Sequence, residues 1–271
     1  MRVIDSSENL LVGTDYRRHI LASEDLSPEE VIQHSVTCGL SQICQTNGPA
    51  FETELNTSSI MLNDPQKFID CPVSSILSPK SASKATESRL TQFSATFQKA
   101  SEKIGHLDAF RFHLIQAGRS ESLVSDASLA ADEMFTNAIF NAPFVDLKTH
   151  HNPGIDRADA SIQMNSDRSA RLFMGHLNDR LVVGCSDPYG SLDVARLLAR
   201  IQDCCLRGVS NTIRLGAGGA GIGSYLVYNT GSAYYVGVQH GRATVVCSAI
   251  QWQWSSRKRS EALKNLHWFQ L

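Results

Sequence analysis

The chain has 271 residues, of which 42% are apolar and 19% are charged, a balance typical of a globular protein with a sizeable core. Its net charge of −2 gives no general attraction to nucleic acid or to an acidic membrane surface, so neither is expected as a partner. No apolar run approaches the roughly 18 residues that a membrane helix needs, and the first residues lack a signal-peptide pattern. The seven cysteines form no CxxC pair, which favours reduced thiols in a cytoplasmic protein over a disulfide framework or a zinc site.

Residues 1–75 are predicted to form a small α/β domain, although no motif in them indicates a role. Ser27, Pro28 and Glu30 have the spacing of a capping box, which predicts a helix from Pro28 to about Cys44. A strand is expected over 58–62 and a short helix over 65–69. The stretch before residue 89 is rich in Ser, Pro and Lys, which predicts a linker over 76–88 and a second domain over 89–271.

The elements of the second domain are predicted from periodicity and turn signals. Apolar residues at spacings of three and four indicate a helix up to about Ala117. The further elements expected are a helix over 128–142, strands over 160–165, 170–177 and 180–186, helices over 192–206 and 224–228, a hairpin of 233–238 with 243–250, and a basic amphipathic helix over 257–268.

The helix over 128–142 carries three polar side chains at positions i, i+4 and i+8, namely Glu133, Asn137 and Asn141. Ser125 or Asp126 is its expected N-cap, and Pro143 ends it. Residues at this spacing lie on one side of a helix. They face either water or a ligand, and considered alone such a stripe favours water.

A glycine run, GAGGAGIG over 216–223, leads into the helix that begins near Ser224. Glycines let the backbone approach a phosphate closely, and the free N–H groups at a helix start attract the anion. A Walker A loop would need a Lys after the last glycine, and none is present. A dinucleotide fold would need an acid about 20 residues further on, but no Asp or Glu lies between Asp203 and Glu261.

The same acid-free interval carries Arg207, Arg214 and Arg242, and near its end the basic residues at 257–259. This local excess of positive charge indicates an anionic ligand, with phosphate the natural candidate. The neighbouring pair His150 and His151 could suggest a metal site. Because two adjacent side chains on a regular element cannot both face one ion, a solvated loop is favoured there.

Two segments resemble motifs of one known family. EMFTNAI at 133–139 is very similar to the N box, and GGAGIGSYLV at 218–227 to the G2 box, of the anti-sigma-factor serine/threonine kinases. These kinases belong to the GHKL (histidine-kinase-like) ATPase superfamily. With the strands expected between the motifs, the resemblance covers residues 84–250. It implies a Bergerat-type ATP-binding fold, which is a two-layer α/β (α+β) sandwich with a mixed, mostly antiparallel sheet packed on helices, and it implies ATP and Mg²⁺ as cofactors.

The resemblance also implies roles for single residues. Glu133 would be the catalytic general base, Asn137 would hold Mg²⁺, and Asp187 would accept a hydrogen bond from the adenine amino group. Gly190 would let the base approach the backbone, and Thr244 matches a threonine near the adenine. Asn141 either contacts phosphate or faces only the loop. The phosphate-cradling lid would consist of Gly218, Gly219, Gly221 and Gly223.

The family's adenine box has the pattern Asp-x-Gly-x-Gly, whereas this chain has DPYGS at 187–191, with one glycine and a stiffening Pro188. Two functions follow. The first is a regulatory kinase that uses Mg-ATP to phosphorylate Ser or Thr on an anti-anti-sigma-like or sigma-factor-like partner protein. The alternative is a nucleotide-binding switch or docking module with little or no phosphoryl transfer. The retained Glu133 favours the first and the altered adenine box the second; the resemblance also allows a homodimer.

Overall fold

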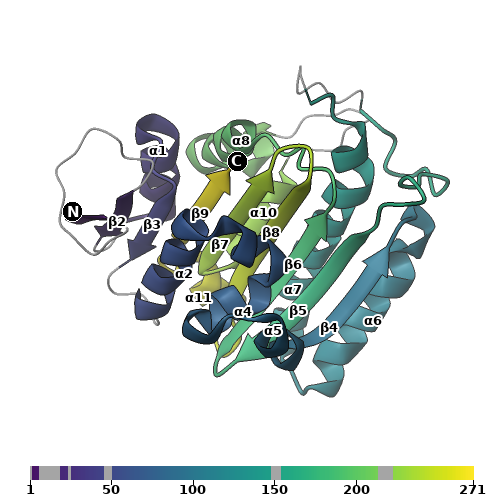
Figure 1. The fold of residues 1–271 in the computed structure, drawn as a ribbon, viewed down its shortest axis with the longest axis horizontal. Helices are drawn as coiled ribbons and strands as arrows, with labels where there is room; N and C mark the ends of the chain where they lie inside the picture. Colours follow the sequence, from purple (N-terminus) through teal and green to yellow (C-terminus); the bar gives the residue numbers. More distant parts are fainter. Residues whose placement is uncertain (1, 6–18, 24–25, 46–50, 148–153, 213–221) are drawn as a thin grey trace.

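A nine-stranded sheet forms the centre of the molecule in the computed structural model, which describes residues 2–5, 19–23, 26–45, 51–147, 154–212 and 222–271 (Figure 1). Along the sheet the strand order is β1-β2-β3-β9-β7-β8-β6-β5-β4. The strands are β1 (Arg2–Asp5), β2 (His19–Ser23), β3 (Gln42–Gln45), β4 (Thr91–Phe97), β5 (Ala170–Leu177), β6 (Arg180–Asp187), β7 (Ala233–Gln239), β8 (Ala243–Gln251) and β9 (Asn265–Gln270).

Most neighbouring strands are antiparallel; among the described strands, β2 with β3 and β7 with β9 are the parallel pairs. Tight turns set the register of the central part. Asn178, with a φ of 56°, closes the β5–β6 hairpin, and Gly241, with a φ of 70°, closes the β7–β8 hairpin. The predictions of strands over 170–177 and 180–186 and of a hairpin over 233–250 are therefore confirmed, as is the mixed, mostly antiparallel sheet.

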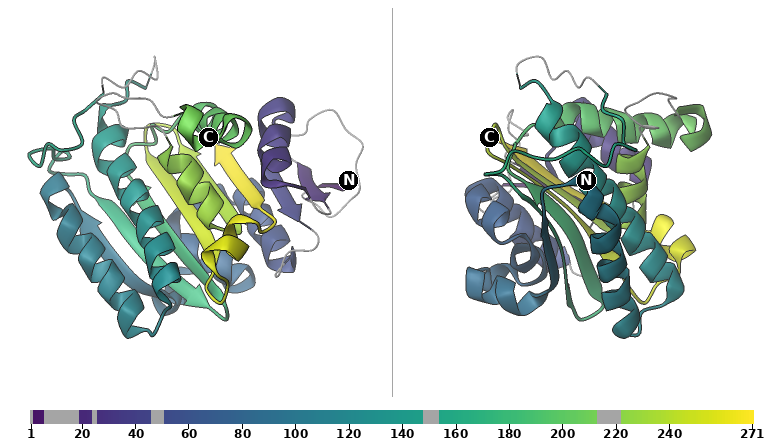
Figure 2. Two further views of the ribbon diagram at one scale, coloured as in Figure 1. Left: turned by 180° about the vertical axis from the view of Figure 1, so that it is seen from behind. Right: turned by 90° about the vertical axis from the view of Figure 1, so that its right-hand side faces the viewer.

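One face of the sheet is covered by the helices that follow residue 100, together with α1, as the two views in Figure 2 show. These helices are α1 (Pro28–Cys38), α6 (Lys103–Gln116), α7 (Glu121–Thr136), α8 (Val194–Arg207) and α10 (Gly223–Thr230). Alternate residues of the central strands point into this core, for example Leu172 and Met174 of β5. Sheet and helices together form the predicted α/β sandwich.

The opposite face of the sheet is covered by four helices, α2 (Phe51–Asn63), α3 (Pro65–Asp70), α4 (Pro72–Leu77) and α5 (Lys84–Leu90) (Figures 1 and 2). Their apolar side chains, such as Phe68 and Ile76, pack against Phe173 and Val182 of the sheet. The helices thus add a layer that the sequence did not predict. The segment 76–88, for which a linker was predicted, contains the end of α4, a 3₁₀ turn at Pro79–Ser81 and the start of α5.

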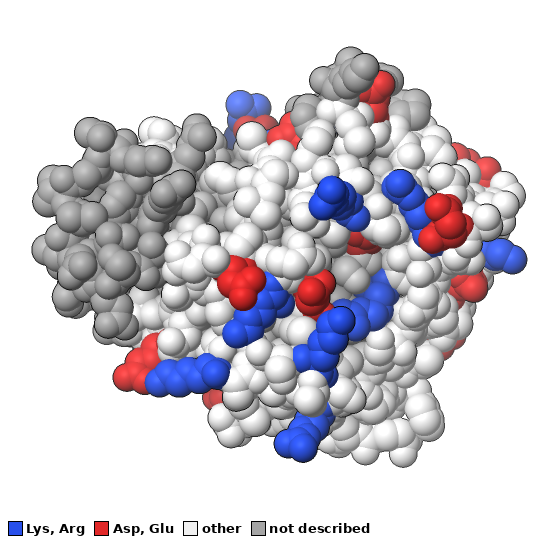
Figure 3. All heavy atoms as spheres, in the orientation of Figure 1, with Lys and Arg blue, Asp and Glu red and all other residues white. Residues whose placement is uncertain are grey.

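The N-terminal strands extend the same sheet, because β3 pairs with the C-terminal strand β9, which in turn pairs with β7. The division into domains over 1–75 and 89–271 stays a prediction about folding units. No helix within the described ranges is long and apolar enough to cross a membrane. On the face shown in Figure 3, acidic and basic side chains outside the grey residues are interspersed instead of gathered by sign.

Several local predictions were wrong. Residues 58–62 lie in α2, not in a strand, because a short apolar run cannot by itself distinguish a buried helix from a strand. The predicted first helix ends at Cys38, where Gly39 adopts a left-handed φ of 68° and stops it before β3. Residues 160–165 form no strand beyond one isolated bridge between Lys99 and Gln163.

Two strands lie in segments for which helices were predicted. Residues 91–97, within the helix expected up to Ala117, form the edge strand β4, in which Phe93, Ala95 and Phe97 alternate in the manner of a strand. The basic tail over 257–268 is helical only in α11 (Ser256–Ser260) and then becomes β9. In both places the pairing partner lies far away in sequence, so tertiary contacts override the local pattern.

A buried ionic cluster joins α2 to the sheet. The carboxylate of Glu54 pairs with Arg180 of β6, and it accepts a hydrogen bond of 2.8 Å from the hydroxyl of Tyr235 in β7. His267 Nε2 of β9 lies 2.8 Å from the same carboxylate. Burial alone would raise the pKa of Glu54, but the Arg180 charge and the interactions with His267 and Tyr235 together outweigh it and lower the pKa to about 2. Glu54 is therefore ionised inside the protein.

We expect Arg180→Met to lower the free energy of unfolding by about 3–5 kcal/mol, because it leaves the Glu54 carboxylate buried without its guanidinium partner. Urea denaturation near neutral pH measures the change. The matched control is Arg111→Met, which removes an exposed guanidinium from α6 and should change stability by less than about 0.5 kcal/mol. A loss below about 1 kcal/mol for Arg180→Met would contradict the importance of this ion pair.

Candidate functional site

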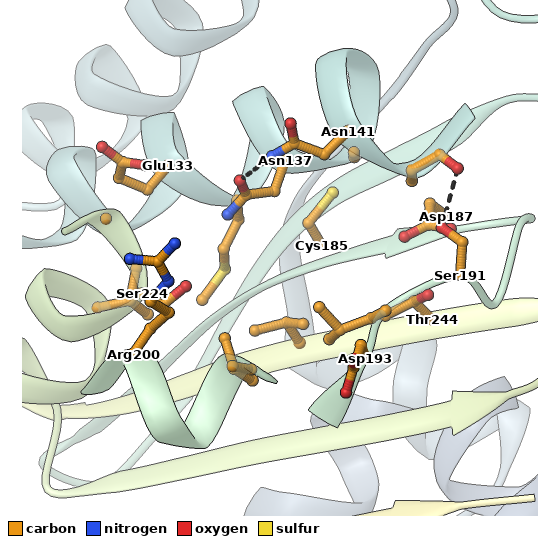
Figure 4. Close-up of a pocket in the computed structure, with 18 of the residues that line it drawn as sticks. Glu133, Asn137, Asn141, Cys185, Asp187, Ser191, Asp193, Arg200, Ser224 and Thr244 are labelled. Atoms are coloured by element: carbon orange, nitrogen blue, oxygen red, sulfur yellow. Dashed lines mark hydrogen bonds between the residues drawn. The ribbon is translucent and has the colours of Figure 1, made fainter. Parts of the chain in front are cut away.

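A cavity of about 370 Å³ opens between the sheet and the helices of the first face (Figure 4). Its walls come from α7 and the turn that follows it, from the ends of β6 and β8, and from α8 and α10. The volume lies within the range of small-molecule sites in proteins. Apolar side chains such as Met134, Leu197 and Val227 form part of the lining, and charged and polar side chains form much of the rest.

Helix α7 positions the first polar group. It begins at Glu121, seven residues before the predicted start, and its N-cap is Ser120 instead of Ser125 or Asp126: the Ser120 hydroxyl accepts from the backbone N–H of Leu123. Its buried face is rich in alanine, including Ala127, Ala130 and Ala131, and these small side chains allow the helix to lie close to the sheet. Glu133, on the last turn of α7, faces the cavity.

The helix predicted over 128–142 is not regular to its end. After Thr136 it continues as a π-helical turn over Asn137–Asn141, followed by a 3₁₀ turn over Ala142–Phe144. The widened turn presents both asparagines to the cavity, and Asn141 Nδ2 donates a 2.7 Å hydrogen bond to Asn137 Oδ1. π turns of this kind are frequent at functional sites.

Six of the predicted site residues line this one cavity although they come from separate parts of the chain. They are Glu133, Asn137, Asn141, Asp187, Gly223 and Thr244. Gly218, Gly219 and Gly221 lie outside the described residues, as do His150 and His151.

Gly190 does not line the cavity. It has a φ of 58° and packs against the turn between β7 and β8, where its carbonyl accepts from the N–H of Gly241 at 3.2 Å. A Cβ at this position would overlap the carbonyl oxygen of Gln239. Both the left-handed backbone and the close approach therefore require glycine here.

Asp187 ends β6 at the far side of the cavity from Glu133 (Figure 4). One of its carboxylate oxygens accepts from the backbone N–H of Tyr189 at 2.9 Å. Burial nevertheless raises the pKa of Asp187 to about 7. Thr244, its partner across the β6–β8 pair, is only 3% exposed and lies beside the carboxylate, yet its hydroxyl makes no hydrogen bond of standard geometry within the described residues. This end of the cavity thus holds two buried polar groups that can form further hydrogen bonds.

Glu133 is half-buried, and this burial raises the pKa of its carboxyl group. The nearby guanidinium of Arg157 acts in the opposite direction without cancelling the effect. The carboxylate also contacts Gly223, the first residue of α10. A carboxylate with a raised pKa at the wall of a cavity is suited to accept a proton.

Three arginines that sequence reasoning missed complete the lining: Arg157, Arg196 and Arg200. Figure 4 shows Arg200 reaching from α8 toward Ser224 on the Glu133 side of the cavity, away from Asp187. Arg196 and Arg200 lie at i, i+4 on α8, opposite the buried Leu198 and Ile201, and this spacing was the signal available in the sequence.

The cationic residues that the sequence did single out lie elsewhere. Arg207 is exposed near Asp203 at 3.9 Å, Arg257 belongs to α11, and neither lines the cavity; nor does Arg242. Arg214 falls outside the described residues. The expectation of an anionic ligand therefore rests on α8 and Arg157 instead of the acid-free interval.

The described side chains contain no group of three or more His, Cys, Asp or Glu that could hold a metal ion by itself. Asn137 can supply one amide oxygen, which suits Mg²⁺ when phosphate oxygens and water provide the remaining ligands. The cavity therefore combines a cationic end, a carboxylate with a raised pKa, one hard oxygen ligand and a buried acidic end. The sequence matches no model of a known protein family and no curated protein, so the function has to be inferred from these residues.

The stability of the ligand-free protein should fall as pH rises from about 4 to about 7, because folded Asp187, with a pKa of about 7, keeps a proton that the unfolded chain loses near its ordinary pKa. Asp187→Asn removes this contribution. Urea denaturation of both proteins at about pH 5 and about pH 8 isolates it from other titrating groups. The variant should gain stability relative to the parent at the higher pH; an equal difference at both values would contradict the buried acid.

Proposed function

We propose that this chain binds Mg-ATP in the cavity and transfers the terminal phosphoryl group to a Ser or Thr hydroxyl of a regulatory partner protein, in the manner of the anti-sigma-factor serine/threonine kinases. The observation that carries the proposal is the convergence of Glu133, Asn137 and Asp187 on one cavity. Glu133 and Asn137 are neighbours at i and i+4 at the end of α7, whereas Asp187 comes from the end of β6, so the tertiary fold brings this acid to the other two.

The polarity of the cavity supports one orientation of the nucleotide. An adenine amino group can donate to the Asp187 carboxylate, and this bond would favour its ionised form and offset the cost of burial. The Thr244 hydroxyl, without a standard hydrogen bond of its own, is available at the same end. The phosphates would then extend toward Arg157, Arg200 and the start of α10, where cationic side chains and a helix N-terminus suit them.

Asn137 would hold the magnesium ion. Its Oδ1 accepts one hydrogen bond, from Asn141, and an amide oxygen has a second lone pair for a metal. When bound, Mg²⁺ neutralises charge on the phosphate oxygens. Asn141 thereby gains a role that the sequence left open, since its hydrogen bond orients the Asn137 oxygen.

Glu133 would act as the general base, because burial raises the pKa of its carboxyl toward the range in which proton transfer is efficient. It takes the proton from the acceptor hydroxyl as that oxygen bonds to the γ-phosphorus, while the bond to the β–γ bridging oxygen breaks and ADP leaves. Arg157 and Arg200 would stabilise the charge on the transferred group. A partner resembling anti-anti-sigma or sigma factors, and a homodimer, remain part of this proposal.

A second function, a nucleotide-dependent switch with little phosphoryl transfer, is favoured by one observation. Gly190, the single glycine of the altered adenine box, is used to pack against the β7–β8 turn and does not face the cavity. Recognition of the base would then depend on Asp187 and Thr244, and occupancy of this pocket would be sensed through the β7–β8 hairpin.

Titration calorimetry with ATP tests the binding site. The parent protein should bind ATP more tightly with Mg²⁺ than without it, and Asn137→Ala should lose that dependence because its side chain supplies the metal ligand. Asn63→Ala, on an exposed end of α2 across the sheet, is the matched control and should behave like the parent. An absence of binding at millimolar ATP would refute the proposal as a whole.

Glu133→Gln separates the two functions. It preserves size and removes the proton acceptor, so phosphoryl transfer or ATP hydrolysis should fall by about 10²–10⁴-fold while the Mg-ATP dissociation constant stays within about threefold. Release of ADP from labelled ATP measures turnover. Glu121→Gln, exposed at the start of α7, serves as control. A parent protein that binds Mg-ATP but shows no turnover with any acceptor would leave the switch as the function.

A further inference from the structure

Gly223 lies directly against the carboxylate of Glu133. A Cβ built on Gly223 would overlap the carboxyl carbon and both oxygens of that side chain, while no other described group outside its own chain neighbours comes as near. The contact joins two elements distant in sequence, the last turn of α7 and the first residue of α10. Both residues line the cavity.

The backbone conformation does not explain a glycine at this position. The positive φ angles within the described residues do not include residue 223, and the residue is part of the α10 helix. Glycine in a helix interior costs roughly 1 kcal/mol relative to alanine, and at the first helical position, where Gly223 stands, the preference for alanine is smaller. A methyl group would be favoured here by helix propensity and is excluded by the space that Glu133 occupies.

Glu133 has charged neighbours on two other sides. Arg157 lies on the cavity side and favours the ionised carboxylate, whereas Asp132 opposes it. Lys103 of α6 is engaged elsewhere, at 2.5 Å from Asp132 and 2.8 Å from the hydroxyl of Thr136. No hydrogen bond from a described side chain holds the Glu133 carboxylate in place, so its position is determined largely by packing, with Gly223 as the nearest wall.

We propose that Gly223 is a positioning residue for the general base: the missing side chain provides the space in which the Glu133 carboxylate is held. This role differs from the cradling of phosphate that the glycine-rich motif implies. It rests on the proposed function of Glu133 as the base. The contact between Gly223 and the Glu133 carboxylate, however, is already present in the protein without nucleotide. Gly223 therefore affects how fast the chemistry proceeds and leaves the strength of nucleotide binding nearly unchanged.

Gly223→Ala tests the proposal through three readouts. The added methyl group pushes the carboxylate out of its half-buried position toward water, so the Glu133 pKa, followed by carboxyl ¹³C NMR and assigned by its loss in Glu133→Gln, should fall toward its ordinary value. Turnover should drop by about 10-fold to 100-fold, as expected for a misplaced catalytic group. The Mg-ATP dissociation constant should stay within about threefold.

Gly105→Ala is the matched control, since a Cβ there meets nothing within 4 Å and the residue lies in α6. It should leave all three readouts unchanged. An affinity loss of about 10-fold or more in Gly223→Ala with an unchanged Glu133 pKa would overturn the proposal and indicate a phosphate cradle. An unchanged pKa with unchanged turnover would overturn it as well.

The NMR readout needs neither nucleotide nor acceptor. If the parent protein failed to bind Mg-ATP, the proposed function would fall, while the pKa of Glu133 in Gly223→Ala would still decide whether this glycine seats the carboxylate. A shifted Glu133 pKa supports the role of Gly223 in positioning the carboxylate, and an unshifted Glu133 pKa refutes it. Failure of the proposed function and failure of the positioning role of Gly223 therefore give different results.

Discussion

The ionised Glu54 carboxylate is the constraint on which the arrangement of the sheet depends. A buried charge is tolerated only when its partners are all in place, and here they come from β6, β7 and β9. Strand β6 begins at Arg180 and ends at Asp187. The ion pair with Glu54 on one face of the sheet and the acidic end of the cavity on the other therefore belong to the same strand. A slip of one residue would turn both side chains to the wrong faces, which links the ion cluster to the site across the sheet.

The cavity owes its shape to an interruption of regular structure. After Thr136 the helix widens into a π turn, and within this turn Asn141 donates to Asn137 at the cavity wall. The alanine face of α7 brings this turn close to the sheet, within reach of the pocket that β6 and β8 line. Local irregularity and close packing therefore act together to assemble polar groups in an otherwise apolar core.

The parts of the fold that could be predicted were those encoded locally. The β5–β6 and β7–β8 hairpins carry their turn residues, Asn178 and Gly241, between alternating strands, and α8 ends at a glycine. Strands β4 and β9 could not be recognised, because their partners are remote and their sequences also fit helices. Within the site, Glu133, Asn137 and Asp187 were predicted from motif resemblance, whereas Arg200 was missed because its spacing on α8 resembles that of a solvated face.

The place of β9 in the sheet has a consequence for the order in which the protein acquires its structure. Strand β3 is connected to the rest of the sheet through β9, so β3 can join the larger sheet only after residues 265–270 have been synthesised. Contacts of such long sequence separation form slowly and leave strand edges exposed in the meantime. Strands β1, β2 and β3 can pair with one another beforehand, but they become part of the nine-stranded sheet only when β9 pairs with both β3 and β7.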